Sequence, residues 1–483
     1  MNSDHAAPAG GLFTSSLQRR ATAICLIALI GGELAYLHSG AWLPQMLAMA
    51  ATLGFYAVAI SRLGLRERLL VLVCLGLSAA LWLRGDPAAL GRALGQATFL
   101  VAFVQTMGLL REAAVRSAAV REVGAYLTRQ PPRRRTLAVL LGGQGLGVLL
   151  NFGALSLLSP LIQSGVRATS PDPEIARIRE RRQLSALLRG FSWIVVWAPT
   201  TVTQALLTDT LPGADTAVLA ALGLATTVLI IALAWGEDEL RWRKTAARLR
   251  ASGRLVQEPP SLPRTAARNL LGIVALLIAV TLAIRWLSGV ATVPALMLTA
   301  PVCLVLWTLL QNHRLGLAPA LRGTGQALRE AAGGAIPNSA RECATLGASG
   351  FIGVAAAALV STETVAAWLA MVQPSPAVFL IALPLLIVTA GQFALSPIMM
   401  VVFLASIISA LPQAPADITL IAFALSCGWA ITMTASPNAA GALIMARVSG
   451  RTPYELTWGW NLGFSLLAFG AVALVFLALT GLW

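Results

Sequence analysis

The sequence predicts an all-α polytopic membrane protein, and its composition, its long apolar runs and the placement of its charges all indicate that class. Its 483 residues are 57% hydrophobic and 11% charged, whereas soluble domains average about 25% charged residues. The mean hydropathy is +0.77. Apolar runs of roughly 18 or more residues recur along the chain, as membrane-crossing helices require. A transmembrane β-barrel would show short alternating segments instead.

The apolar runs predict about eleven transmembrane helices after a cytoplasmic N-terminal tail at 1–21. An extra first helix is predicted at 22–41, and it precedes the two repeats described below. The predicted crossings are 22–39, 42–62, 68–84, 92–112, 183–210, 215–235, 268–288, 291–311, 341–372, 416–447 and 459–482.

Two further apolar segments, 136–165 and 375–411, are predicted to be re-entrant hairpins. The first lies between the basic stretches 129–135 and 167–182, so a single crossing would place one basic stretch outside. The second is flanked by nearly uncharged loops, which suits entry from the outer side. With eleven crossings and two hairpins, the N-terminus is expected in the cytoplasm and the C-terminus in the periplasm.

The net charge of +15 follows the positive-inside pattern and does not indicate a nucleic-acid partner. All 35 Lys and Arg fall on one set of alternating loops except Arg84, Arg92 and Arg285. Basic stretches on these loops are expected to lie near anionic lipid headgroups. The main ones are Arg133–Arg135, Arg179 with Arg181 and Arg182, and the segment Arg241–Arg268.

The two halves of the chain echo each other. GFSWIVVWAP (190–199) and GWAITMTASP (428–437) both begin with Gly and end with Pro, 238 residues apart. NFGALS (151–156) is echoed by QFALS (392–396) with one deletion. Inverted repeats with interrupted helices at matching positions are typical of secondary transporters.

The chain therefore divides into a first repeat at 42–235 and a second at 268–483, joined by a basic cytoplasmic linker at 236–267. Each repeat is expected to contain one hairpin and one broken helix. The broken helices are predicted at 183–210 and 416–447, because Pro199 and Pro437 fall inside them.

Breaks at bilayer depth are costly unless they line a cavity, so these segments are the predicted binding site. Helix N-termini there suit an anion, and freed carbonyl and hydroxyl oxygens suit Na⁺. The candidate substrate- and ion-binding residues are Asn151, Phe152, Gly153, Pro199, Thr200, Thr201, Thr203, Gln392, Ser396, Thr434, Ser436, Pro437 and Asn438. A Na⁺ ion is expected near Asn151, Thr200, Ser436 and Asn438.

Other chemistry-bearing residues are few. Glu33 and Glu363 lie within apolar runs and are candidate proton-relay carboxylates. GGQGLG (142–147) lacks the preceding strand and the Lys-Ser/Thr of a phosphate loop. The three histidines lie in tails or loops and form no metal cluster or catalytic triad. Apart from Na⁺ or H⁺ as coupling ion, no cofactor is expected, and no enzymatic activity is expected.

At the two helix breaks and at the tips of the two re-entrant hairpins, the chain resembles the ion transporter superfamily. This superfamily includes divalent anion/sodium symporters and arsenite permeases. TASPNAAGALIMARVSG (434–450) is similar to the family's second Pro-Asn break, and GVLLNFGALSLLSPLI (147–162) to its first hairpin. The resemblance implies a homodimer whose protomers divide into a scaffold and an elevator-like transport domain. The first tip reads Leu-Asn-Phe rather than the family's Ser-Asn-Thr, so Na⁺ and H⁺ both stay open as coupling ion.

The expected function is secondary active transport of a small anionic solute, dicarboxylate-like or inorganic, across the inner membrane by elevator-type alternating access. The expected partners are that solute, the lipid bilayer and a second copy of the chain. One alternative is a proton-driven exporter of an arsenite-like or drug-like solute. Another is a membrane enzyme or lipid-modifying protein, which would need a polar catalytic cluster at a membrane face.

Overall fold

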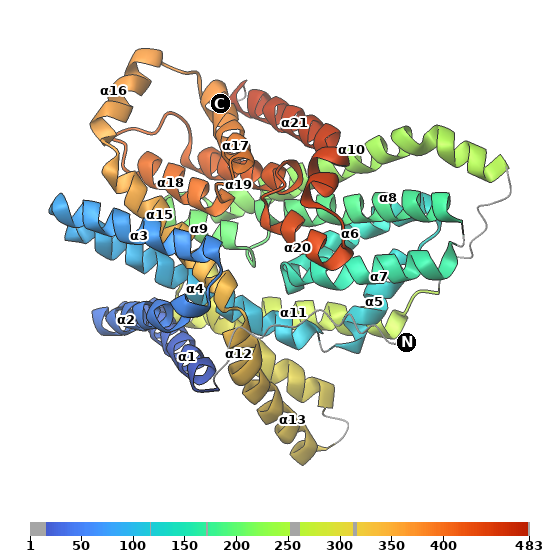
Figure 1. Cartoon of the computed structure of the whole chain (residues 1–483), viewed down its shortest axis with the longest axis horizontal. Helices are drawn as coiled ribbons and strands as arrows, with labels where there is room; N and C mark the ends of the chain where they lie inside the picture. Colours follow the sequence, from blue (N-terminus) through green and yellow to red (C-terminus); the bar gives the residue numbers. More distant parts are fainter. Residues whose placement is uncertain (1–15, 116, 171, 252–260, 313–315, 482–483) are drawn as a thin grey trace, which may run out of the picture.

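Helices make up the described architecture. The computed structural model describes residues 16–115, 117–170, 172–251, 261–312 and 316–481 (Figure 1). Within these ranges there are α-helices and short 3-10 and π turns, and there are no strands. The all-α prediction is confirmed. Residues 1–15 of the predicted tail and 252–260 of the predicted linker lie outside the described ranges.

The described residues of the first half form ten α-helices. They are α1 (Ser16–Ser39), α2 (Trp42–Ala59), α3 (Leu65–Leu83), α4 (Pro87–Val115), α5 (Ala118–Thr128), α6 (Pro132–Leu150), α7 (Gly153–Thr169), α8 (Pro173–Ser192), α9 (Val202–Thr210) and α10 (Thr216–Ala251). Two 3-10 turns accompany them, η1 (Ile60–Arg62) and η2 (Trp193–Val196).

The second half continues with helices α11 to α21. They are α11 (Arg264–Ser288), α12 (Thr292–Asn312), α13 (Leu317–Glu330), α14 (Ile336–Asn338), α15 (Ala340–Leu359), α16 (Thr362–Val372), α17 (Pro376–Gln392), α18 (Pro397–Ser409), α19 (Ile418–Ala435), α20 (Ala440–Ser449) and α21 (Leu462–Gly481). Two π turns lie among them, η4 (Ala331–Ala335) and η5 (Glu455–Gly459).

Nine helices of the described chain are long and apolar enough to cross a membrane. Two of the eleven predicted crossings are not among them. The crossing at 68–84 coincides with α3, which begins with the charged residues Arg66, Glu67 and Arg68. The crossing at 183–210 is divided between α8 and α9.

Two boundaries differ from the sequence-based expectation. The run 341–372 is two helices, because Val360 is extended and the Ser361 hydroxyl caps α16 by accepting a bond from the Thr364 amide. Helix α10 continues to Ala251, so the first part of the predicted linker is helical.

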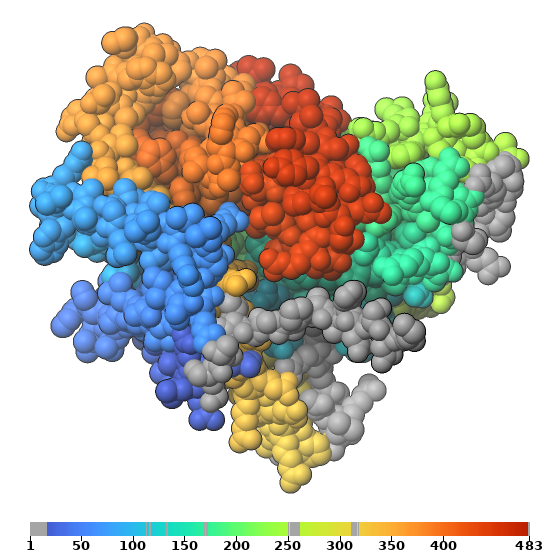
Figure 2. Space-filling view, in the orientation of Figure 1, coloured from blue at the N-terminus to red at the C-terminus, as the bar shows by residue number. Residues whose placement is uncertain are grey.

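The same order of elements occurs twice: a helical hairpin, a helix pair separated by a break, and a long apolar helix. In the first half these are α6–α7, α8–α9 and α10, and in the second half α17–α18, α19–α20 and α21. The apolar window of α19–α20 is 89% buried, whereas that of α11 is only 6% buried. The second break therefore lies at the centre of the protein, and α11 lies at its periphery. Figure 2 shows the red second-half segment lying against the teal segment that contains α7 and α8, and the orange segment lying against the blue one.

Candidate functional site

The first break lies between η2 and α9. Pro199 has no amide hydrogen, so the helical hydrogen bonds cannot continue through it. The side chain of Gln204 compensates for the interruption. Its amide nitrogen donates to the carbonyls of Val195 and Val196 at 2.9 and 3.0 Å. The Thr201 hydroxyl donates to the Ala198 carbonyl at 2.8 Å.

Two hydroxyls at this break have no partner among the residues that the structure describes. Thr200 is 6% exposed and Thr203 is fully buried, yet neither Oγ1 forms a hydrogen bond with any described residue. Buried polar groups in native proteins are nearly always paired, with protein, water or a ligand. Among the predicted site residues, Thr200 and Thr203 are therefore the ones whose hydroxyl groups are free to bind a solute or ion.

The first hairpin tip is formed by Asn151 and Phe152. Asn151 ends α6 with a positive φ of 50°, which reverses the chain, and Gly153 begins α7. Asn151 and Phe152 are both half-buried. The Phe152 ring lies 5.3 Å from that of Phe191 on α8, so the tip packs beside the first broken helix.

Gln144 holds this hairpin to the first break. Its amide nitrogen donates to the Gly190 carbonyl at 2.7 Å, and its oxygen accepts from the Trp197 indole at 2.9 Å. Gly190 has no side chain, and a Cβ there would collide with the Leu140 carbonyl of α6. Gln144 was not predicted as a site residue, because GGQGLG was considered as a phosphate loop and as part of the hairpin around Asn151, without regard to its one amide side chain. The sequence feature that could have identified Gln144 is that its amide side chain stands alone in an otherwise apolar hairpin.

The second break is bonded to the second hairpin tip. The Ser436 hydroxyl donates to the Gly391 carbonyl at 2.6 Å. The Asn438 amide donates to the carbonyls of Gly391 and Gln392 at 3.3 and 3.2 Å. Pro437, between them, is buried. These side chains thus donate to the last carbonyls of α17, of which that of Gly391 also accepts from the Ala394 amide at 3.2 Å.

The other predicted residues of the second half lie around this contact. The Gln392 oxygen accepts from the Trp458 indole at 3.1 Å. Ala394, beside it in the tip, has a positive φ of 63°, as Asn151 has in the first tip. Ser396 precedes α18 and is half-buried, with no side-chain capping bond. Thr434 is buried and within 2.9 Å of the Ser465 hydroxyl on α21.

The two halves meet at α20. Because Gly441 has no side chain, α20 approaches Leu155 of α7 and Leu188 of α8, which would lie within 3.5 Å of a Cβ at this position. Helix α19 also packs against η2 of the first break. The structure therefore brings both breaks and the first hairpin into one packed unit, and the second tip joins it through Ser436.

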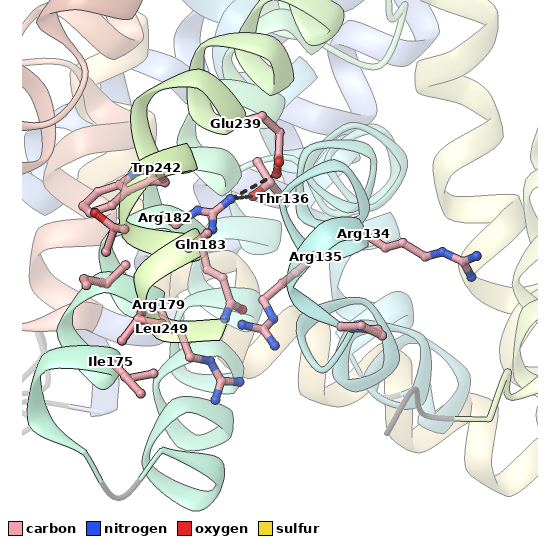
Figure 3. Close-up of a pocket in the computed structure, with 14 residues that line it drawn as sticks. Arg134, Arg135, Thr136, Ile175, Arg179, Arg182, Gln183, Glu239, Trp242 and Leu249 are labelled. Atoms are coloured by element: carbon pink, nitrogen blue, oxygen red, sulfur yellow. Dashed lines mark hydrogen bonds and ion pairs between the residues drawn. The ribbon is translucent and has the colours of Figure 1, made fainter. Parts of the chain in front are cut away.

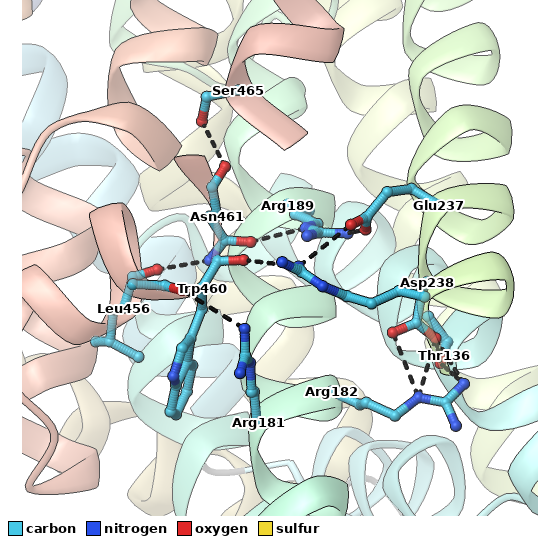
Figure 4. Close-up of polar contacts among 12 residues, drawn as sticks. Thr136, Arg181, Arg182, Arg189, Glu237, Asp238, Leu456, Trp460, Asn461 and Ser465 are labelled. Atoms are coloured by element: carbon cyan, nitrogen blue, oxygen red, sulfur yellow. Dashed lines mark hydrogen bonds and ion pairs between the residues drawn. The ribbon is translucent and has the colours of Figure 1, made fainter. Parts of the chain in front are cut away.

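Ion pairs on α8 fasten the same unit (Figure 4). Arg189 is 4% exposed and donates to Glu237 of α10 and to Asn461, both at 2.7 Å. Arg182, one of the arginines expected near the lipid headgroups, pairs with Asp238 at 2.6 Å. Burying such charges is costly unless they are paired, so α8, α10 and the segment before α21 are held in register.

A further ion pair closes the end of α20. Arg451 pairs with Glu180 of α8 at 2.5 Å, and Gln163 of α7 donates to the same carboxylate. The hydrogen bond with Glu180 raises the pKa of Arg451, since it favours the protonated guanidinium. This pair links the first and second halves outside the apolar windows.

A cavity of about 830 Å³ lies between α1, α2, α4, α9, α15 and α18. Its wall contains Glu33, which is 3% exposed, together with Asp86, Arg92 and Asp209. Gln96 also lines it, and its amide nitrogen has no partner among the described residues. Asp209 was not singled out from the sequence, because it falls at the end of a predicted crossing.

Glu363 has a different position from Glu33. It lies in the first turn of α16, is exposed, and accepts a hydrogen bond from the Ser361 hydroxyl at 2.8 Å. The sequence placed it inside a crossing because the break at Ser361 carries no Pro or Gly. The structure therefore does not bring Glu363 to the wall of the cavity that Glu33 lines.

Comparisons with known proteins give a structural match. No family model matches the chain, and no curated protein matches it in sequence. Among solved structures it is similar to the YdaH transporter of Alcanivorax borkumensis, described as having an unusual topology. The TM-score is 0.52 at 16% identity, over 86% of this chain and 98% of that chain.

The chain therefore shares its fold with that transporter. The resemblance to the ion transporter superfamily at the breaks and tips stays a prediction, since no family model supports it. Among the described residues, no group of three or more His, Cys, Asp or Glu is placed to hold a metal ion.

Proposed function

We propose that the protein is a secondary active transporter that moves a small anionic solute across the inner membrane by elevator-type alternating access. The observation that best supports this proposal is that the buried hydroxyls of Thr200 and Thr203 have no hydrogen-bond partner among the described residues. They lie at a break that packs against a hairpin and a second broken helix. An unpaired buried hydroxyl costs about 1–3 kcal/mol, so such groups are retained where a ligand or ion meets them.

Helix ends support an anionic substrate. Four helices, α7, α9, α18 and α20, begin at a tip or a break. Each helix N-terminus carries roughly +0.5 of an elementary charge and free amide hydrogens. Discontinuous helices of transporters direct these ends at anionic groups of their substrates. A dicarboxylate or an inorganic anion has the matching charge and size.

The coupling ion is Na⁺ or H⁺. Hydroxyl oxygens at Thr200 and the side-chain oxygen of Asn151 are suitable Na⁺ ligands. The buried carboxylate of Glu33 in the same cavity as Asp209 favours H⁺. The acidic cavity also supports the second candidate function, proton-driven export of an arsenite-like or drug-like solute.

The elevator mechanism assigns the packed unit of hairpins and broken helices, α6–α9 and α17–α20, to a transport domain. Helices α1, α2, α4, α12 and α15 would form the scaffold, with homodimerisation through a peripheral face. The large cavity lies between these two groups of helices, which supports relative movement there.

Thermal unfolding of the purified full-length chain tests the proposal. The protein is screened against dicarboxylates, phosphate, sulfate and arsenite, with and without Na⁺, at pH 6 and pH 8. A substrate raises the unfolding midpoint with its occupancy, and a coupling ion strengthens that effect. The stabilising anion is then tested for uptake into proteoliposomes. If none of the anions stabilises the protein and none is transported under any of these conditions, anion transport is contradicted.

A further inference from the structure

The large cavity lies at one end of the molecule, between α1, α2, α4, α9, α15 and α18. Figure 1 shows α2, α3 and α16 at this end, and α7, α8 and the C-terminal part of α10 at the other. The other end has a smaller cavity lined by Arg134, Arg135, Arg179 and Arg182 (Figure 3). Since the positive-inside pattern assigns these arginines to the cytoplasm, it assigns the large cavity to the outer side.

The wall of the large cavity carries more negative than positive charge. Among the described residues that line it, the acidic ones are Glu33, Asp86 and Asp209, and the basic one is Arg92. Asp86 also caps α4, because its carboxylate accepts a hydrogen bond from the Ala89 amide at 2.9 Å. A cavity with an excess of carboxylates attracts a cation and repels an anion.

Glu33 is buried without a partner. It is 3% exposed, lies within the apolar run of α1, and forms no hydrogen bond or ion pair with any described residue. Asp209 is exposed on the wall of the same cavity, and its charge is close enough to repel that of Glu33. A buried carboxylate is costly unless its charge is offset, so a bound cation would stabilise Glu33.

Gln96 is the second observation that indicates a ligand. It lines the cavity from α4 and is 8% exposed, and its amide nitrogen has no hydrogen-bond partner in the described part of the chain. The same is true of the Thr210 hydroxyl, which lines the cavity at the end of α9. A ligand oxygen would accept from the Gln96 amide and satisfy it. A proton on Glu33 would neutralise the carboxylate but would supply no such acceptor.

Much of the remaining wall is apolar. It includes Leu37, Met46, Met49, Phe99 and Ile407, and the volume of the cavity is about 830 Å³. Sites for small organic molecules typically have volumes of about 300–1,000 Å³ and place a few polar groups on an apolar wall. The cavity therefore suits an organic molecule better than a bare inorganic cation.

We propose that this cavity binds an amphipathic organic ammonium ion from the outer side. The ammonium group lies at Glu33 and Asp209, because it carries three N–H donors and no acceptor, as the lysine side chain does. A hydroxyl or carbonyl oxygen of the ligand accepts from the Gln96 amide, and the alkyl portion lies against Met49 and Phe99. This ligand is chemically distinct from the anion proposed above, so its binding does not depend on anion transport.

The test measures the thermal unfolding midpoint of the full-length chain in a neutral detergent, at pH 8 and constant ionic strength. The probe is 6-amino-1-hexanol, whose amine keeps its proton at this pH, as lysine does. Three matched compounds accompany it: hexylamine lacks the hydroxyl, 1,6-hexanediol lacks the charge, and 6-hydroxyhexanoate reverses the charge. We expect a saturable rise with 6-amino-1-hexanol, a smaller rise with hexylamine, and none with the diol or the carboxylate.

Four outcomes would overturn the proposal. An equal rise with the diol would indicate apolar binding alone, and a rise with 6-hydroxyhexanoate would indicate an anion site. An equal rise with ammonium chloride would assign the cavity to a small inorganic cation. The absence of a rise with both amines would exclude an ammonium site directly.

Charge variants assign the response to the cavity. Glu33→Gln should weaken the apparent affinity for 6-amino-1-hexanol at least about tenfold, because a hydrogen bond to a charged group is lost. Arg92→Gln removes a positive charge from the same wall and should strengthen binding, a gain that a misfolded variant could not produce. Glu363→Gln is the matched control, since Glu363 is exposed at the start of α16 and is not part of the wall. Equal losses in Glu33→Gln and Glu363→Gln would indicate a general charge effect and overturn the site.

Gln96→Leu tests the contact with the ligand oxygen. It removes an amide nitrogen that has no partner among the residues described, so little stability should be lost. The variant should respond equally to 6-amino-1-hexanol and hexylamine, because the donor to the hydroxyl is gone. An unchanged preference for the amino alcohol would overturn the role given to Gln96. Because the readout is stability with and without an amine, a failure of anion transport would leave these results unaffected.

Discussion

The Ser436 hydroxyl of the second break donates a 2.6 Å hydrogen bond to the Gly391 carbonyl of the second hairpin tip. The Asn438 amide donates to the same carbonyl at 3.3 Å. One carbonyl at the end of α17 thus receives two side chains from the broken helix. These hydrogen bonds join the second break to the second hairpin tip, so the two are expected to move together.

Removal of these donors is expected to destabilise that unit. Ser436→Ala should lower the stability by about 1–3 kcal/mol, because it removes the bond to Gly391 and leaves the Asn438 backbone amide without its acceptor, the Ser436 hydroxyl. The Ser436→Ala, Asn438→Ala double variant should lose more than the sum of the single variants, because each side chain backs up the other at Gly391. Thermal unfolding and proteoliposome uptake measure both effects. Ser164→Ala, on an exposed face of α7, is the control, and simple additivity would contradict the shared role.

Thr200→Val and Thr203→Val test the first break. Valine keeps the shape of threonine and removes only the hydroxyl, which has no partner among the described residues. We expect an unfolding midpoint equal to or above that of the wild type, together with loss of the substrate- or Na⁺-dependent midpoint shift. Thr208→Val on the same helix removes a hydroxyl that bonds its own backbone, and it should keep the shift. Normal uptake in the Thr200→Val, Thr203→Val double variant would exclude both hydroxyls from the site.

The ion pair of Arg189 with Glu237 is expected to contribute to the stability of the fold. Arg189→Met leaves Asn461 without its buried donor and Glu237 with only its 3.2 Å ion pair to Arg241, and it should cost about 1–3 kcal/mol. Combining it with Glu237→Met should restore part of that loss, since no unpaired charge remains. The exposed Arg241 gives the comparison: Arg241→Gln should cost below about 1 kcal/mol. Similar midpoints for the variants at positions 189 and 241 would be inconsistent with this account.

Glu33→Gln tests proton coupling. Its carboxylate is buried in the wall of the large cavity, and glutamine cannot take up a proton there. Uptake driven by an imposed pH gradient should be lost, whereas exchange of substrate at equal pH should persist. Glu363→Gln is the matched control, because Glu363 is exposed at the start of α16. Gradient-driven uptake that survives in Glu33→Gln and requires Na⁺ would assign the coupling to sodium.

The apolar runs and the proline positions were sufficient to predict much of the architecture. Helix crossing of a bilayer depends on local hydrophobicity and length, which a single sequence displays directly. Pro199 and Pro437 remove backbone donors wherever they occur, and the structure has helix ends at both. Asn151 lies between α6 and α7 for a similarly local reason, because Asn tolerates a positive φ.

Which residues far apart in the chain form hydrogen bonds and ion pairs was decided by the tertiary structure. Arg182 forms an ion pair with Asp238, 56 residues away in the sequence, and a count of charges along the chain does not show that pairing. Gln144 and Asp209 became notable only through the residues that surround them. The sequence alone determined that the helices cross a membrane and where they break, because hydrophobicity and proline act locally. Only the packing decided which breaks, tips and charges meet, because burial and pairing depend on residues far apart in the chain.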